Sequence, residues 1–396
     1  MTKSKQLVVA GVMSGTSADG IDVAFCRIRA SASGAPQIKL IGAREFRYPK
    51  AVRSSILAAM DAKSMSVAEM SRLHWRLGEI YAEAVQATAE ELGVNVDLVG
   101  SHGQTIYHQG VAAKYLGQPT RCTWQIGEPS VIAEALRTPV ISDFRPADLA
   151  AQGQGAPLVP MLDYVLFRSE NVSRVLQNLG GIANMTAIPA AATSADVLAF
   201  DSGPSNMVID ACMNRLFHKL FDRNGACARR GAVLRPVVDE LLRDPYYSAP
   251  PPKSCGREEF GERFVDRFVA LCRRSKASSE DIVATATALT AETILDAYRR
   301  FVWPHLGQKA PMARHIEYIV GGGGARNTTL MEMLHGGLEP LGVRVRSTDE
   351  LGVPTQAKEA VAFALLAWLT WNDLPGNIPS ATGAIRPVIL GKVTYA

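Results

Sequence analysis

Apolar residues along this chain follow two alternating patterns. Short apolar runs of strand length end in turns rich in Gly, Ser or Asp: QLVVAGVM before SGTSADG, VDLVG before SHGQT, RVLQNL before GGIAN, DVLAF before DSGPSN, and IEYIV before GGGGARN. Between them, longer stretches place apolar residues three and four positions apart, which predicts helices over 67–92, 205–221, 265–274, 285–302 and 358–371. Strands that alternate with helices predict an α/β protein with a mostly parallel sheet.

The strand and helix pattern suggests two places where domains meet. A chain of 396 residues is too long for one ordinary core, so two domains are expected. The pattern restarts near 138–145, and 373–383 is rich in Pro, Gly and Ser. We therefore expect one domain over 1–137 plus 375–396 and another over 138–374. By its composition, the triple-Pro stretch 248–260 is expected to be a surface loop.

Composition narrows the class of protein. Hydrophobic residues make up 47% and charged residues 20%, as in a soluble globular chain. The net charge of +4 is spread along the sequence without a basic block, so nucleic acid is not the expected partner. No stretch approaches the roughly 20 apolar residues that cross a bilayer, and the first apolar run does not fit a signal peptide. Six Cys without a CxxC pair indicate buried reduced thiols in a cytoplasmic protein.

Several common signatures are absent from the sequence. It contains no GxxxxGK[ST] phosphate loop, no HExxH, no GxSxG elbow, no EF-hand loop, and no GxGxxG after a strand. The Gly-rich turns after the strands can nevertheless form anion-binding concavities, because glycine exposes backbone N–H groups. Each turn alone is equally explained as a tight corner. Several of them after strands favour a phosphate-binding role.

The stretch FDSGPSN places Asp201 where a strand ends. Among phosphate-binding turns, such a carboxylate can hold Mg²⁺ or take a proton from an attacking oxygen. The alternative is that Asp201 caps the following helix, but Ser205 is the better-placed cap. Neither interpretation is excluded by this stretch alone.

Other candidates lie in polar segments between the predicted elements. Arg145 could clamp a carboxylate or phosphate, or form a surface ion pair with a neighbouring Asp. His102 could polarise a group or simply satisfy its neighbours. Trp124 could stack on a sugar or belong to the core. Glu359 opens an apolar helix and could serve only its N-terminus.

Together these segments resemble a known family. VMSGTSADGIDVA, GSHGQTIYH, TWQIGEPSVIAE, SDFRPADLAAQGQGAPLVP, NLGGIAN, FDSGPSN, GREEF, GGGGARNTTLMEML, STDELGVP and LPGNIPSATGA occur in the order found in the anhydro-N-acetylmuramic acid kinases. The resemblance covers essentially the whole chain. It implies the two-domain actin-like, hexokinase-like ATPase fold, in which two domains with RNase-H-like sheets close over an interdomain cleft.

The resemblance also implies a reaction. Such a kinase uses ATP with Mg²⁺, opens the 1,6-anhydro ring of anhydro-N-acetylmuramic acid with water, and phosphorylates O6. The product is N-acetylmuramic acid 6-phosphate, in the recycling of cell-wall peptidoglycan. The family's catalytic aspartate falls on Asp201, which would deprotonate the attacking water.

The resemblance assigns further residues to the site. Expected phosphate and nucleotide contacts are Ser14, Gly15, Thr16, Ser17 and Asp19 in the first loop, Gly180, Gly181 and Asn184 in the second, and Gly322, Gly323 and Asn327 on the adenosine side. Expected sugar contacts are Thr105, Arg145, Asp148 and Glu359. Other actin-like kinases have an aspartate where this chain has Met13, so we expect Asp201 or Asp19 to support the metal.

The chain departs from the family pattern at two positions. Gln152 replaces one of two paired glycines before QGAPL, and Ser205 replaces a glycine after FDSGP. The remaining alternatives are a kinase for another anhydrosugar, a sugar-independent ATPase of the same fold, and a non-catalytic sensor of sugars or nucleotides. By analogy, a homodimer is expected.

Overall fold

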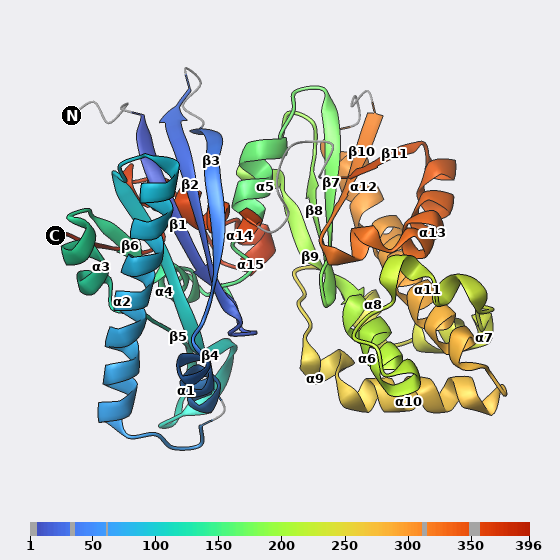
Figure 1. Ribbon diagram of the computed structural model, residues 1–396. Helices are drawn as coiled ribbons and strands as arrows, with labels where there is room; N and C mark the ends of the chain where they lie inside the picture. The colour runs from blue at the N-terminus through green and yellow to red at the C-terminus, as the bar shows by residue number, and fades with distance from the viewer. Residues whose placement is uncertain (1–5, 32–35, 61, 311–314, 348–356) are drawn as a thin grey trace. The chain divides into compact units, whose positions relative to one another are not determined.

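The chain folds into two compact units. The computed structural model describes residues 6–31, 36–60, 62–310, 315–347 and 357–396 (Figure 1). One unit comprises Met1–Leu166 with Gln356–Ala396, and the other Phe167–Thr355. These limits differ from the expected ones, because 138–166 and 356–374 contain β6 and α14, which join the first unit's sheet.

The first unit has a sheet flanked by helices. Its 7-stranded sheet has the order β12-β6-β4-β1-β2-β3, with β5 paired to β4. The strands are β1 Leu7–Ser14, β2 Gly20–Ala30, β3 Pro36–Arg47, β4 Leu98–Tyr115, β5 Gln118–Ile126, β6 Val140–Ser142 and β12 Lys392–Thr394. The helices are α1 Lys50–Met60, α2 Val67–Leu92, α3 Pro129–Leu136, α4 Phe144–Ala150, α5 Pro160–Phe167, α14 Lys358–Trp371 and α15 Pro379–Thr382.

The second unit has a 5-stranded sheet in the order β11-β10-β7-β8-β9. The strands are β7 Val172–Leu179, β8 Ile182–Ile188, β9 Leu198–Pro204, β10 His315–Gly321 and β11 Val343–Ser347. The helices are α6 Asn206–Phe217, α7 Arg235–Leu241, α8 Pro245–Ser248, α9 Arg257–Phe260, α10 Glu262–Arg274, α11 Ser279–Ala297, α12 Trp303–Lys309 and α13 Thr328–Leu338. Short helical turns occupy Ser194–Asp196, Arg223–Gly225, Ala228–Arg230, Tyr298–Val302, Gly323–Arg326 and Glu339–Leu341.

Both sheets are built on the same plan. In each, three successive antiparallel strands (β1–β3, β7–β9) are followed by two strands that add in parallel beside the first (β4 and β6, β10 and β11). This repeated order confirms the expected pair of RNase-H-like sheets. The expectation of a mostly parallel sheet was wrong, because β2, β3, β8 and β9 follow their partners through short connections, which only antiparallel strands allow.

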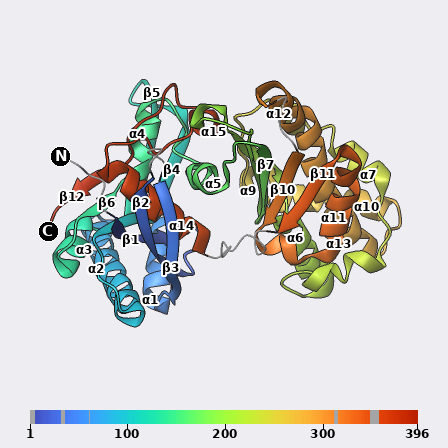
Figure 2. The same ribbon diagram turned by 90° about the horizontal axis from the view of Figure 1, so that it is seen from above.

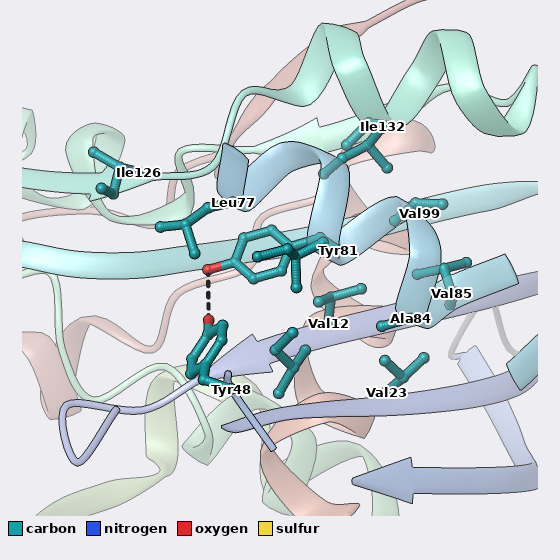
Figure 3. Close-up of a cluster of buried hydrophobic side chains, with 14 of the residues drawn as sticks. Val12, Val23, Tyr48, Leu77, Tyr81, Ala84, Val85, Val99, Ile126 and Ile132 are labelled. Atoms are coloured by element: carbon teal, nitrogen blue, oxygen red, sulfur yellow. Dashed lines mark hydrogen bonds between the residues drawn. The ribbon is translucent and has the colours of Figure 1, made fainter. Parts of the chain in front are cut away.

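The core of the first unit lies between its sheet and α2. Val12, Val23 and Val99 extend from the strands towards Leu77 and Tyr81 of the helix, and all are buried (Figure 3). The hydroxyl groups of Tyr81 and the buried Tyr48 are 3.2 Å apart at the edge of this cluster. A tyrosine hydroxyl buried among aliphatic groups needs a hydrogen-bond partner, and the two tyrosines provide one for each other. The Tyr48 hydroxyl also donates to Ser14 at the end of β1, so the pair links the core to the loop that follows this strand.

The second unit buries α11 against its sheet. Figure 2 shows α11 and α13 on the same side of this sheet. Val175 and Phe200 of the strands pack with Ile294 of α11 and Leu334 of α13. α11 starts at a capping box in which Ser278 and Asp281 satisfy each other's backbone N–H groups.

The helix predictions were accurate where apolar periodicity was long. The predicted helices over 67–92 and 358–371 coincide with α2 and α14. α2 begins at the N-cap Ser66 and ends at Gly93, whose φ of 62° suits glycine. No helix in the described ranges is both long and apolar enough to span a membrane. All six cysteines are free, but Cys122 is exposed, contrary to expectation.

Candidate functional site

The first predicted phosphate loop follows β1, as expected. Gly15–Ala18 forms a turn closed by the Ala18 N–H to Gly15 O bond of 3.1 Å. Thr16 and Ser17 are exposed at its tip. Their hydroxyls and the neighbouring amides are therefore accessible to an anion.

Ser14 has a different role from its neighbours. Its side chain is 2% exposed, and its Oγ donates to Gln104 Oε1 at 2.6 Å while accepting from the Tyr48 hydroxyl at 2.8 Å. Gln104 Nε2 in turn donates to Gly15 O at 3.1 Å. Ser14 thus holds the loop in place, and its predicted contact with the nucleotide stays a prediction.

Asp19, a predicted metal ligand, closes the loop on its exposed side. Its carboxylate accepts from Arg53 Nη2 at 3.1 Å, and both side chains are largely exposed. A surface ion pair of this kind stabilises little and is easily exchanged for another cation.

α14 lies on the sheet over two glycines and so places Glu359 near the other predicted sugar contacts. A Cβ on Gly11 would overlap Ala360 O, and one on Gly100 would overlap Phe363 O. Only glycine allows this close approach of helix and strand. Glu359, in the first turn of α14, is exposed and close enough to influence the charge of Arg145.

Arg145, in α4, is held by two bonds that leave part of its guanidinium unused. Its Nε donates to His102 Nε2 at 3.0 Å and its Nη1 to Gly155 O at 2.8 Å. Burial lowers the pKa of Arg145 to about 10, so it stays charged at neutral pH. Burial and the Arg145 charge keep the pKa of His102 well below its usual value. His102 is therefore neutral, with Nδ1–H donating to Gly103 O.

Thr105 lies in the part of the chain expected to be a loop. The structure shows instead that β4 runs on through Leu98–Tyr115, with a register shift against β5 after Thr105. Thr105 Oγ1 accepts from Gln125 Nε2 at 3.2 Å and is half-buried. Its hydroxyl hydrogen remains available to a ligand.

Asp148 is the best satisfied carboxylate of the predicted set. It is fully buried, and its Oδ1 accepts from Asn377 Nδ2 and Thr382 Oγ1, both at 2.7 Å. Its Oδ2 accepts from the Gly155 N–H at 2.7 Å, and a Cβ on Gly153 would overlap it. Asp148 thus joins the 153–155 loop to the C-terminal segment, and its sugar contact stays a prediction.

Asp22 was missed by the sequence analysis. It lies on β2 opposite Met13 of β1 and Glu45 of β3. Burial raises its pKa to about 6, and the charges of Glu45 and Glu359 add to the rise. The signal was a carboxylate in the otherwise apolar run IDVAF. Asp22 therefore places a carboxylate beside Met13, the position at which other actin-like kinases have an aspartate.

Asp201 lies inside β9 rather than beyond its end. It is half-buried, and its Oδ2 accepts one bond, from the Cys255 N–H at 3.0 Å, while Oδ1 has no hydrogen-bond partner among the described residues. Burial raises the pKa of Asp201 to about 6; the Cys255 N–H opposes this rise and the Glu259 charge adds to it. The carboxylate is thus charged near neutral pH and more basic than an ordinary Asp.

The second predicted loop, Gly180–Gly181, is joined to the start of α6. Gly181 O accepts from the N–H groups of Ser205 and Met207, and Gly180 O accepts from that of Asn206. These carbonyls satisfy the first amides of α6. Ser205 occupies the N-cap position, as expected, but its side chain forms no capping hydrogen bond. Ser205 Oγ is buried without a partner among the described residues.

The Gly322–Gly324 turn packs against Asn178 and Leu179 at the end of β7, just before the Gly180–Gly181 loop. Gly322 has φ 89°, and a Cβ there would approach Asn178 Oδ1 at 2.6 Å. Asn206 Nδ2 donates to Leu179 O at 3.0 Å and lies beside Gly324. Sheet pairing places Asn184 directly opposite Asp201. The structure thus brings Asp201, both glycine loops and Asn184 to neighbouring positions.

Beside this edge is a cavity of about 560 Å³ within the second unit. Its lining includes Asn206, Asp210, Gly323, Arg326 and Asn327. Asn327 caps α13 by accepting from the Leu330 N–H at 3.0 Å, which leaves its Nδ2 for a ligand. Asp210 has no hydrogen-bond or ion-pair partner among the described residues. Burial, then the Asp222 charge, raises the pKa of Asp210 to about 6.

No preformed metal centre is present in the described part of the chain, since no three His, Cys, Asp or Glu side chains gather there. Mg²⁺ does not require such a centre, because it commonly binds one or two carboxylates together with substrate phosphates. Within its own unit, each of two carboxylates could be a donor of this kind: Asp201, whose Oδ1 has no partner among the described residues, and the exposed Asp19.

Comparison with known proteins decides the family. Residues 7–396 match the family model described as anhydro-N-acetylmuramic acid kinase. The chain belongs to the anhydro-N-acetylmuramic acid kinase family. It is 43% identical to the anhydro-N-acetylmuramic acid kinase of Bacillus cereus (strain AH187) over 392 residues, which is 98% of this chain and 99% of that protein.

A second relative comes from Caldanaerobacter subterraneus subsp. tengcongensis. This anhydro-N-acetylmuramic acid kinase is 42% identical over 397 residues, covering 99% of this chain and 98% of the relative. Among solved structures, the activator of 2-hydroxyisocaproyl-CoA dehydratase from Clostridium difficile covers 91% of this chain and 94% of its own, at 11% identity and a TM-score of 0.42. As a member of the anhydro-N-acetylmuramic acid kinase family, the protein is a sugar kinase.

Proposed function

We propose that this kinase uses ATP and water to convert 1,6-anhydro-N-acetylmuramic acid into N-acetylmuramic acid 6-phosphate and ADP, in the cytoplasmic recycling of peptidoglycan. Water adds to the anomeric carbon, the bond from that carbon to O6 breaks, and O6 takes the γ-phosphoryl group. One water and one phosphoryl group are therefore added to the sugar.

The observation that carries this proposal is the state of Asp201. A general base needs a carboxylate that is charged at the working pH, keeps an unoccupied oxygen, and is basic enough to accept a proton. Oδ1 of Asp201 has no hydrogen-bond partner in the described part of the chain, and burial raises the pKa of Asp201 to about 6. It lies directly opposite Asn184 and beside two glycine loops, where a phosphate would be bound.

The cavity in the second unit supports a nucleoside site. Its volume of about 560 Å³ is in the range of small-molecule pockets. The Asp210 carboxylate accepts no hydrogen bond from the residues that the structure describes, and the ribose hydroxyls of ATP are donors that would satisfy it. Gly323 and the glycines at 180–181 would face the phosphates.

Mg²⁺ would be held by Asp201 or Asp19 together with the phosphates of ATP. When bound, it supplies positive charge that stabilises the transferring phosphoryl group. The hydroxyls of Thr16 and Ser17 would bind phosphate oxygens.

In the first unit, Arg145, Thr105 and Glu359 would bind the sugar. Among the described residues, Arg145 bonds only to His102 and Gly155, through Nε and one N–H of Nη1, which leaves one edge of its guanidinium for a ligand. Such an edge suits a carboxylate or paired hydroxyls. Asp148 supports Arg145 indirectly, since both hold Gly155.

The proposal is tested by ADP release with ATP and Mg²⁺, with and without anhydro-N-acetylmuramic acid, for the wild type and Asp201→Asn. We expect sugar-dependent release in the wild type, a loss on the order of 10³-fold in the variant, and a product heavier by one water and one phosphoryl group.

Other results would identify another function. Turnover of a different anhydrosugar, such as levoglucosan, at a higher kcat/KM would change the substrate. ADP release that ignores the sugar would indicate an ATPase. Full activity of Asp201→Asn would remove Asp201 as the base.

A further inference from the structure

The segment 249–256, between α8 and α9, lies along the outer edge of the second sheet. It meets Asp201 twice: the Asp201 N–H donates to Lys253 O at 3.0 Å, and the Cys255 N–H donates to Asp201 Oδ2 at 3.0 Å. A third bond, from the Tyr246 hydroxyl to Asp201 O at 2.7 Å, comes from α8. The segment expected to be a plain surface loop therefore fixes both the backbone and the carboxylate of Asp201.

The side chain of Lys253 anchors this segment. Its Nζ donates to the carbonyls of Tyr246 and Tyr247 at 2.9 and 3.0 Å, in α8. The same Nζ lies 4.8 Å from the ring centre of Tyr246, 4.9 Å from that of Phe301 and 5.8 Å from that of Phe200. Carbonyls at a helix C-terminus and aromatic faces both attract a cation.

We propose that Lys253 is a positioning residue for the reaction: its ammonium, held by two carbonyls and three aromatic rings, fixes the segment that keeps the Cys255 N–H on the Asp201 carboxylate. This inference rests on the proposed function, in which Asp201 is the base. Lys253 acts through Cys255 and Asp201, and its ammonium forms its hydrogen bonds with α8.

The position of Asp201 explains why such an anchor is needed. β9 is the outermost strand of its sheet, so one side of Asp201 has no strand neighbour. An unpaired edge strand is free to fray and leaves its N–H and C=O groups open. Lys253 O and the Tyr246 hydroxyl supply the missing backbone partners. The charge of Lys253 decides whether these partners stay in place.

The experiment compares Lys253→Met, which keeps the length and removes the charge, with Lys253→Arg, which keeps the charge. We expect kcat to fall on the order of 10²-fold in Lys253→Met, with the KM for ATP within about twofold of the wild type. Lys253→Arg should recover most of the loss, because guanidinium also binds carbonyls and aromatic faces. The control is Lys309→Met, which removes an exposed lysine paired with Asp196 in the same unit and should leave kcat unchanged.

A second measurement reports on the segment itself. Cys255 is half-buried, and burial raises the pKa of its thiol to about 12, so it should react slowly with iodoacetamide. Release of the segment in Lys253→Met should increase alkylation of Cys255 about tenfold. The exposed Cys122 in the other unit serves as the internal reference. If Lys253→Met fails to fold, Phe301→Leu removes one ring of the anchor and should give the same changes at about threefold.

Three outcomes would overturn the inference: a kcat within twofold of the wild type in Lys253→Met, a lower kcat without faster alkylation of Cys255, or no recovery in Lys253→Arg. A failure of the proposed function is separate, since it would appear as full activity of Asp201→Asn. Loss of activity in Asp201→Asn with a normal Lys253→Met would refute only the role of Lys253.

Discussion

Asp148 in the first unit and Asp201 in the second are both carboxylates removed from bulk water, yet their surroundings differ. Asp148 accepts three hydrogen bonds, from Asn377, Thr382 and Gly155, and is fully buried. Asp201 accepts one from the described residues, the Cys255 N–H, and is half-buried. The family resemblance assigns both residues to the site, but they differ in the number of hydrogen bonds that their carboxylates accept.

The difference shows how to distinguish a structural carboxylate from a reactive one. Three hydrogen-bond donors compensate the free-energy cost of burying a charged carboxylate, so that it stabilises the fold. A single donor leaves the charge partly uncompensated, so burial raises the pKa. The same contrast extends to Asp210, which accepts no hydrogen bond from the described residues. Gln152 belongs to the other side of the contrast, because it lies in the turn that folds around Asp148.

The largest expected effect concerns the framework. Asp148→Ala should lower the free energy of unfolding by about 3 kcal/mol, because three buried donors lose their acceptor. Urea unfolding measures this change. Asp143→Asn, which removes a partly exposed ion pair with Lys392 near the same helix, should cost under about 1 kcal/mol. Equal losses in the two variants would contradict a structural role specific to Asp148.

The next prediction concerns the charge on Asp201. Its folded pKa of about 6 lies above the ordinary 3.8, so folding favours the protonated form. The charged form therefore destabilises the protein above about pH 6, and this penalty disappears as the pH falls towards 4. In metal-free buffer, Asp201→Asn should be more stable than the wild type by about 1–2 kcal/mol at pH 8.

This difference should shrink towards zero near pH 4, and unfolding curves at both pH values measure it. Asp266→Asn provides the control, because Asp266 is an exposed partner of Arg215 in the same unit. A wild type that is more stable than Asp201→Asn at pH 8 would mean that Asp201 is as well satisfied as Asp148.

Asp210 extends the comparison to binding. If its carboxylate accepts a hydrogen bond from the ribose hydroxyls, Asp210→Ala should raise the KM for ATP about tenfold and leave kcat within about twofold. The variant would lose one charge-assisted hydrogen bond to the nucleotide. Steady-state kinetics with ATP and 2′-deoxy-ATP measures this effect. The wild type should prefer ATP, and the variant should treat the two nucleotides alike. A preference that survives in the variant would place the ribose elsewhere.

The smallest effect is expected at Gln152. Its φ of 68° lies in the left-handed region, where glycine is at ease and a side chain is strained. Gln152→Gly should therefore raise the free energy of unfolding by about 0.5 kcal/mol. Ala150→Gly, two residues earlier in the exposed last turn of α4, should lower it by a similar amount. Calorimetry of both variants gives the sign, and two changes of the same sign would contradict the argument.

Long periodic segments were predictable from the sequence. α2 and α14 were placed with their ends because 14 to 26 residues of helical spacing outweigh local exceptions. The hairpin strands β2, β3 and β5 were not identified. Their apolar alternation is interrupted, as at Asp22, although each pairs with a strand that neighbours it in sequence. An interrupted alternation hides a strand, because strand formation depends on burial and on side chains across the sheet as much as on local pattern.

The loops of the candidate site could be picked out from the sequence, but the residues that hold them in place could not. The glycine turns and Asp201 stand out because their residue types are unusual after strands. Lys253 does not, because a lysine in a polar segment is ordinary until its partners are known. The domain border was misplaced for a similar reason, since nothing local shows that α14 returns to the sheet of β1.

The return of α14 to that sheet also bears on how the protein is made. The second unit is continuous in sequence, and every strand of its sheet has left the ribosome once residue 347 is outside the exit tunnel. The first unit lacks α14 and β12 until residues 358–394 follow. The second unit can therefore be completed before the first during synthesis. The nascent first unit leaves Gly11 and Gly100, which α14 covers in the folded protein, exposed until α14 has been made.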